Sequence, residues 1–215
     1  MKGKICYVLL LFGMLGLTME AAGALPFRGW YELGGTFMEN AELESFFDES
    51  VSGNEVKFDP GFRAAMAIGK ELTRYVAIEA EGAFHYNSIR SIKDATSDDG
   101  ELYQVPVFGN LVLQFPNRTR LVPVIGGGVG AVFSMLHADE IALGASEFSE
   151  TEEAWSFAFQ GFAGLLYSFR DDMALGLTYH YVNADGPTWN GRSGEDIEID
   201  RLVTHSLGLT FSFRF

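Results

Sequence analysis

The sequence has almost no cysteine, little positive charge and few long apolar runs. Its 215 residues include one cysteine, Cys6, so the chain beyond residue 24 has no thiol for a disulfide or for a metal site. Lys and Arg number 15 against 29 Asp and Glu, and the net charge of −14 argues against a nucleic-acid partner. After residue 24 the one candidate for a membrane helix is Leu121–Leu136, and its four glycines, its proline and its short length argue against a spanning helix.

The N-terminus has the three parts of a secretory signal peptide. Two lysines precede an apolar run at residues 5–17, and the small residues 22–24 provide a cleavage site. We therefore expect residues 1–24 to be removed and residues 25–215 to form a single domain. Cys6 lies near the start of the apolar run rather than at the cleavage site, so a lipoprotein anchor is not expected.

The rest of the chain alternates between polar and apolar residues, which is the pattern of β-strands. We expect eight strands, at 29–39, 57–69, 75–88, 102–115, 121–133, 155–169, 173–183 and 202–215. Their connections are short at 70–74, 116–120 and 170–172, and long and acidic at about 41–55, 90–101, 139–153 and 185–201. Short turns that alternate with long loops predict four hairpins that stand side by side.

The two faces of these segments differ as expected for a sheet surrounded by lipid. On one face of 102–115, Tyr103 and Phe115 enclose apolar residues, and they lie about 40 Å apart along a strand, or roughly 28–30 Å along a tilted barrel. The opposite faces of the segments carry Glu32, Arg63, Glu79, Glu81, His85, Gln104, Asn110, Gln160, His180 and Arg214. An apolar outside and a polar inside predict an all-β fold, an eight-stranded antiparallel transmembrane up-and-down β-barrel.

Two further details of the strands concern glycine and proline. Glycines at 126, 128 and 130 fall on the inward face, where they leave room for bulky neighbours such as Phe108 and Phe162. Pro106 and Pro123 lie inside expected strands, where each removes a hydrogen-bond donor and so suggests a bulge or a strand end.

The order and spacing of several stretches resemble the small eight-stranded outer-membrane barrels of the OmpA-like and opacity-protein group. These stretches are FDPGFRAAMAIG, AIEAEGAFHY, VPVIGGGVGAVF, FAFQGFAGLLYSF, LGLTYHY and HSLGLTFSFRF. The resemblance covers residues 28–215 and implies the outer membrane of a Gram-negative-type bacterium, with both termini in the periplasm. It also implies that the aromatic residues of the last strand, Phe211, Phe213 and Phe215, are the signal read by the barrel-assembly machinery.

The inward-facing charges predict a structural plug. Glu79 and Glu81 are two residues apart, Glu32 joins the neighbouring wall once the barrel closes, and Arg63 and Arg214 supply the opposite charge. An eight-stranded barrel has just enough lumen for side chains to fill. We therefore interpret these five residues as an interior ionic plug, with a pair of catalytic carboxylates as the alternative.

The sequence contains no motif that indicates a cofactor, a resident metal or an enzyme. Barrels that deacylate lipid A resemble this chain and use a His and a Ser two residues apart, whereas His205 and Ser206 are adjacent and point to opposite faces. The stretch IGGGVGA at 125–131 contains G-x-G-x-x-A, but no amphipathic helix follows it, so we do not interpret it as a nucleotide site.

The expected function is a non-enzymatic structural or surface-interaction role that presents four acidic loops. The simplest interpretation of their charge is a solvated, self-repelling surface. A surface ligand or a divalent cation is the alternative, although no loop has the spaced Asp/Asn-Gly pattern of a calcium site. Two other functions stay open, a narrow outer-membrane pore and a lipid-modifying enzyme.

Overall fold

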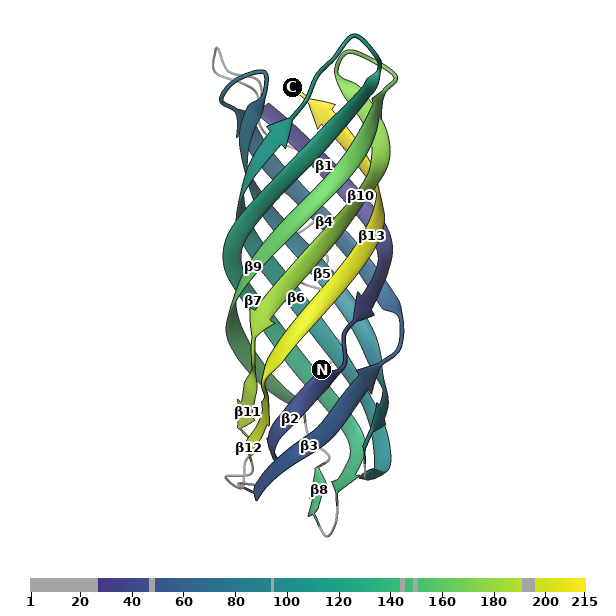
Figure 1. Cartoon of the computed structure of the whole chain (residues 1–215), viewed down its shortest axis with the longest axis vertical. Helices are drawn as coiled ribbons and strands as arrows, with labels where there is room; N and C mark the ends of the chain where they lie inside the picture. Colours follow the sequence, from purple (N-terminus) through teal and green to yellow (C-terminus); the bar gives the residue numbers. More distant parts are fainter. Residues whose placement is uncertain (1–26, 47–48, 94, 144–145, 149–150, 191–195) are drawn as a thin grey trace.

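The computed structural model describes residues 27–46, 49–93, 95–143, 146–148, 151–190 and 196–215. These residues form strands joined by turns, and the strands close into a barrel (Figure 1). Among them there is no helix long and apolar enough to cross a membrane. The expected signal peptide at 1–24 lies outside the described residues and stays a prediction.

Eight strands make the wall of the barrel. They are β1 (Phe27–Met38), β4 (Gly61–Glu71), β5 (Val76–Ile92), β6 (Ala95–Gln114), β7 (Leu121–Leu143), β9 (Thr151–Ser168), β10 (Met173–Asp185) and β13 (Arg201–Arg214). Each pairs antiparallel with the next, and β13 pairs with β1, which closes the ring. The prediction of an eight-stranded antiparallel barrel is confirmed.

The two ends of the barrel differ. One end, called the turn end, has the three short connections, and there the backbones of Phe27 and Phe215 exchange two hydrogen bonds of 3.0 Å. The other, called the loop end, carries five further strands: β2 (Ala41–Phe46), β3 (Glu49–Phe58), β8 (Ser146–Phe148), β11 (Thr188–Asn190) and β12 (Asp196–Ile199). The turn end is at the top of Figure 1.

The long acidic connections are largely strands, so their predicted extent as loops was wrong. β5 continues to Ile92, β6 begins at Ala95, and β6 pairs with β7 as far as Ala95 opposite Leu143. The segment 41–55 forms most of a hairpin, β2 with β3. Ladder hydrogen bonds from neighbouring strands stabilise an extended backbone in sequences whose charges locally favour a loop.

Neither proline produces a bulge, one of the two expected effects, although Pro123 lies near a strand end, three residues into β7 and next to the last β6–β7 pair. Pro123 lies in register opposite Leu165, and Pro106 lies in register opposite Val132. On the other side of Pro106 the β5–β6 ladder is interrupted between the pairs Gly82–Val107 and His85–Gln104, but its register is unchanged. The missing donor of proline therefore interrupts one ladder locally without shifting the strand.

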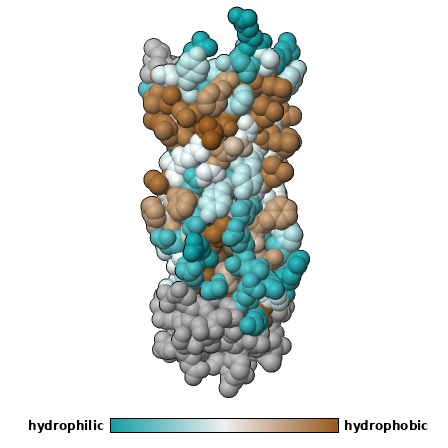
Figure 2. Space-filling view, in the orientation of Figure 1, coloured by the Kyte–Doolittle hydropathy of each residue, from teal (hydrophilic) through white to brown (hydrophobic). Residues whose placement is uncertain are grey.

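The interior of the barrel has two parts of opposite character. Towards the turn end the inward side chains are polar and charged, whereas the outward ones are apolar and exposed, such as Leu33, Val129 and Leu209. Figure 2 shows this hydrophobic band near the turn end, bordered by a hydrophilic rim. At the loop end the interior is instead an apolar core that includes Leu102, Trp189, Leu202 and Ile199. The inward face of the wall thus changes from polar and charged to largely apolar along the barrel.

Candidate functional site

The centre of the polar interior is Arg63, on β4 and fully buried. Its Nε donates to Glu32 Oε1 at 2.8 Å, and its Nη2 donates to Glu81 Oε1 at 2.6 Å. Its Nη1 lies 2.7 Å from Nε2 of His85, which must be the acceptor because a guanidinium has no acceptor atom. Since β4 lies between β1 and β5, one arginine reaches partners on both neighbours.

The carboxylates of Glu32 and Glu81 extend this arrangement across the lumen. The Oε2 atom of Glu81 accepts hydrogen bonds from Asn110 at 2.7 Å and from Gln160 at 2.6 Å. The Oε2 atom of Glu32 accepts from Thr210 at 2.8 Å and lies 3.2 Å from His180 Nε2. We call Arg63, Glu32, Glu81, His85 and these four partners the central network. It joins β1, β4, β5, β6, β9, β10 and β13.

Strand β7 contributes space rather than polar side chains to this level of the barrel. A Cβ atom on Gly128 would collide with the Asn110 side chain and with the carbonyl oxygen of Gly109. A Cβ atom on Gly126 would meet the ring of Phe162, and one on Gly130 would lie 2.8 Å from Phe108. The prediction that these inward glycines make room for bulky neighbours is confirmed.

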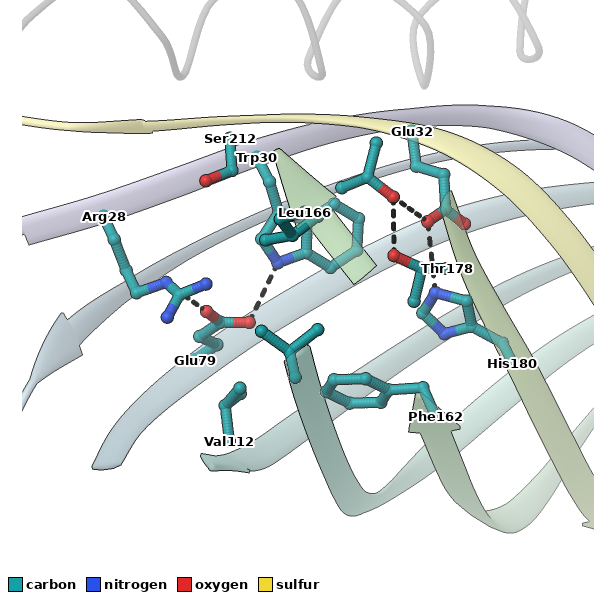
Figure 3. A pocket seen from close by; sticks show the side chains of 12 residues that line it. Arg28, Trp30, Glu32, Glu79, Val112, Phe162, Leu166, Thr178, His180 and Ser212 are labelled. Atoms are coloured by element: carbon teal, nitrogen blue, oxygen red, sulfur yellow. Dashed lines mark hydrogen bonds and ion pairs between the residues drawn. The ribbon is translucent and has the colours of Figure 1, made fainter. Parts of the chain in front are cut away.

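A second cluster lies nearer the turn end, around Glu79. Arg28 Nε lies 2.8 Å from Glu79 Oε1, and Trp30 Nε1 donates to Glu79 Oε2 at 2.9 Å. Arg28 also donates to Gln114 Oε1 at 3.0 Å. The cluster and the central network face each other across a cavity of about 20 Å³ (Figure 3), which is enough for one water molecule. His180 stacks on Phe162 at its edge, with ring centroids 5.2 Å apart.

Four of the five residues expected in the ionic plug lie together inside the barrel. Glu32, Arg63, Glu79 and Glu81 have side chains at most 1 % exposed. Arg214 lies elsewhere, because its strand ends there and its side chain leaves the wall at the turn end. It is 46 % exposed and donates to Glu71 Oε1 at 2.8 Å.

Arg28 was not among the residues expected inside the barrel. The first strand was expected to begin at Gly29, two residues after its actual start at Phe27, which placed Arg28 outside the sheet. The available signal was the alternation of Arg28, Trp30 and Glu32, all three of which point inward and are buried. The second inward arginine is therefore Arg28 rather than Arg214.

On the outer wall, a hydrogen-bonded row is formed by Tyr179 on β10, His205 on β13 and Glu39, which directly follows β1. Tyr179 Oη lies 2.6 Å from His205 Nδ1, and His205 Nε2 lies 2.8 Å from Glu39 Oε1. A base between a hydroxyl and a carboxylate is the order found in nucleophilic enzymes. However, Tyr179 and His205 lie on strands that pair in the β10–β13 ladder, and the backbone N–H of Glu39 donates to the carbonyl oxygen of Val203 at 2.9 Å. The neighbouring N–H groups are therefore not available to stabilise an oxyanion. Ser206 points inward, as expected from its position next to His205.

The C-terminal aromatic residues line the seam between the first and last strands. Phe213 stacks on Phe215 with ring centroids 5.8 Å apart, and it lies 6.2 Å from Phe211. Across the seam, Tyr31 stacks on Phe213 at 5.6 Å and Phe27 stacks on Phe215 at 6.0 Å. These contacts describe the closed barrel; a role as an assembly signal stays a prediction.

In the part of the chain that the structure describes, no group of three or more His, Cys, Asp and Glu residues is arranged to hold a metal ion.

The sequence matches the family model of the outer membrane protein beta-barrel domain over residues 8–215. The chain belongs to this family. As an outer-membrane barrel it is embedded in lipid, which accounts for the exposed apolar band.

The fold of this outer-membrane barrel is similar to that of several solved structures. Neisserial surface protein A is 12 % identical with a TM-score of 0.56, and the match covers 88 % of this chain and 97 % of that one. OprG from Pseudomonas aeruginosa is 13 % identical with a TM-score of 0.55, covering 91 % and 99 %. The outer membrane protein AlkL is 17 % identical with a TM-score of 0.54, covering 93 % and 95 %. A search of curated protein sequences gives no match.

Proposed function

We propose that this protein is a closed outer-membrane barrel with a structural or surface-interaction role, and neither a channel nor an enzyme. The observation that carries the proposal is the central network, in which the fully buried Arg63 bridges Glu32 and Glu81, and Glu81 accepts a hydrogen bond across the lumen from Gln160 on β9. An eight-stranded barrel is only wide enough to be filled by its own side chains. A hydrated ion has no path past this level unless the network breaks.

The apolar core at the loop end supports the same conclusion from the other side. Trp189, on β11, is fully buried within a cluster that includes Leu102, Leu136 and Leu202. This core lies in series with the central network along the barrel. A polar solute would therefore have to cross both a charged, hydrogen-bonded barrier and a largely apolar one.

The enzymatic alternative has one structural feature in its favour, the row of Tyr179, His205 and Glu39 on the outer wall. Its geometry would suit a general base, but a lipid-modifying reaction also needs donors for the charge that develops on the substrate. We therefore assign this row to the outer surface of the barrel, where tyrosine and histidine suit the boundary between lipid and water.

For orientation, we propose that the loop end faces outward and that both termini lie in the periplasm. The loop end carries the acidic segments, which would then form the surface available to a basic partner or to divalent cations. The aromatic seam at Phe211, Phe213 and Phe215 would lie at the periplasmic side, where the assembly machinery would read it.

The closed state is tested by planar-bilayer recordings of the refolded protein, whose barrel is verified by a mobility shift between unheated and boiled gel samples. We expect the shift and no steady openings. Reproducible openings of constant conductance from shifted protein would overturn the proposal. If the protein does not modify lipid, cells that overexpress it should have the same lipid A as control cells.

The orientation is tested with single cysteines, since the chain beyond residue 24 has none. Asp200→Cys, exposed at the loop end, should react with a membrane-impermeant maleimide on intact cells, whereas Thr119→Cys at the turn end should react only after lysis. The reverse pattern would invert the orientation.

A calorimetric titration with Ca²⁺ tests whether the acidic loop end binds cations. A cation site would release or absorb heat, and a surface without one would give no heat of binding.

A further inference from the structure

The turn end of the barrel is basic, in contrast to the acidic loop end. Lys70 lies one residue before the end of β4, Arg74 lies in the turn that follows, and the turn between β6 and β7 carries Arg118 and Arg120. We call these four residues the basic rim. Three of them are exposed and Lys70 is half-buried.

The cations of the basic rim are not neutralised by carboxylates of the protein. Among the described residues, Lys70, Arg118 and Arg120 form no ion pair, and the guanidinium of Arg74 lies over the ring of Tyr75 at 4.6 Å from its centroid. The acidic side chains of this end have other partners. Glu71 accepts from Arg214 at 2.8 Å, and Asp172 lies 3.4 Å from Arg170, which leaves Asp171 as the one further carboxylate of the turns.

The basic rim lies at the boundary of the lipid-facing wall. Tyr75, Phe115 and Leu121 are the outward-facing residues next to these turns, and they are 45–49 % exposed. Long cationic side chains beside such residues can lay their methylene groups on the apolar surface and hold the charge at the headgroup level. Figure 2 shows hydrophilic side chains directly beyond the hydrophobic band at this end.

We propose that the basic rim binds the anionic headgroups of phospholipids in the leaflet that meets the turn end. A phosphodiester offers the oxygen acceptors that guanidinium and ammonium groups require. The cations lie in or next to two turns at one end of the barrel, beside outward-facing apolar side chains, so a lipid can satisfy its headgroup and its chains together. The acidic loop end would repel the same headgroups, so the preference belongs to one leaflet.

The test is native mass spectrometry of the folded, detergent-solubilised protein mixed with phosphatidylglycerol and phosphatidylcholine of identical acyl chains. We expect the wild type to retain phosphatidylglycerol preferentially and to lose this preference as the ionic strength is raised, because the Debye length shortens. Each cation near a membrane surface contributes about 1 kcal/mol, which corresponds to a roughly fivefold loss of retention for each residue replaced.

The variant is Lys70→Gln/Arg118→Gln/Arg120→Gln, and the matched control is Lys57→Gln/Arg90→Gln/Arg201→Gln, which removes the same charge from the loop end. The rim variant should retain both lipids equally, and the control should keep the preference of the wild type. The heat-dependent gel shift verifies that both are folded. Equal retention of both lipids by the wild type would overturn the proposal without affecting the closed barrel, and so would equal losses in the two variants. If a variant does not fold, the wild type alone decides: a preference for phosphatidylglycerol that does not fall with rising ionic strength would overturn the proposal.

Discussion

Replacing Arg63 with methionine should destabilise the barrel more than any other single loss of charge. Methionine keeps an unbranched side chain of similar length but cannot donate to Glu32 and Glu81, whose side chains are at most 1 % exposed. Breaking a buried ion pair by removing one partner typically costs about 3–5 kcal/mol, because the remaining charge is left without compensation. Glu32 and Glu81 keep their other donors, and we therefore expect a loss within that range rather than the sum for two pairs.

The assay is equilibrium unfolding in urea of the protein refolded into lipid vesicles, followed by tryptophan fluorescence and by the gel shift. The matched control is Arg90→Met, which removes an exposed ion pair with Asp59 whose N–O distance is 2.7 Å. Exposed pairs contribute about 0–1 kcal/mol, so this control should change the unfolding free energy little.

A double-mutant cycle separates the ion pair from the loss of packing. Glu81→Gln alone removes one buried charge, and Arg63→Met/Glu81→Gln should be less destabilised than the sum of the single variants, by about 1–3 kcal/mol. A loss of stability in Arg63→Met no larger than that in Arg90→Met would refute the central network as a stabilising element. Additive effects of Arg63 and Glu81 would refute their direct coupling.

The remaining predictions concern other parts of the barrel. Glu79→Gln should lower the urea midpoint, because Arg28 loses its charged partner. Gly128→Ala should cost about 1–3 kcal/mol by overpacking, whereas Gly109→Ala, with no atom within 4 Å of an added Cβ, should be tolerated in the same assay. Trp189→Ala should cost about 3–5 kcal/mol locally and expose the loop end to proteases while the gel shift is retained. Brominated lipids should quench the outward-facing Trp155, which is 69 % exposed, and Trp155→Phe should abolish most of that quenching.

The positions of the wall strands and their inward faces could be predicted from the sequence because a closed sheet in lipid leaves only one arrangement of apolar and polar faces. Glu32, Arg63, Glu79 and Glu81 follow from their phase in this alternation alone. Their partners did not follow, because an inward direction does not determine which side chains meet across the lumen. The register of eight paired strands brings Gln160 to Glu81, and the periodicity of a single strand excludes only shifts by an odd number of residues, which leaves shifts by two open.

The loop end was harder to predict, since the inward-facing residues there are largely apolar, unlike the polar inward-facing residues near the turn end. Leu102 and Leu136 belong to an apolar interior there, while the acidic residues between the strands favour a loop by local composition. The pairing of β6 with β7 beyond the lipid-facing wall is a tertiary effect, since each strand is stabilised by the other. The effect of Pro106 was also hard to predict, because it depends on which neighbouring strand would have accepted the missing hydrogen bond.

The pairing of β1 with β13 places a limit on the order in which the molecule can assemble. The two strands are the most distant in the sequence, and their ladder runs from Arg28 opposite Arg214 to Met38 opposite Thr204. Joining segments so far apart carries the largest entropic cost of loop closure of any pairing in the wall. A hairpin between two sequential strands closes a much shorter loop and costs less. The hairpins can therefore form early, but until the last strand arrives, the sheet has two open edges within the membrane. We therefore expect the seam to close in the final step of folding, and a delay there would leave the intermediate with backbone groups exposed to lipid.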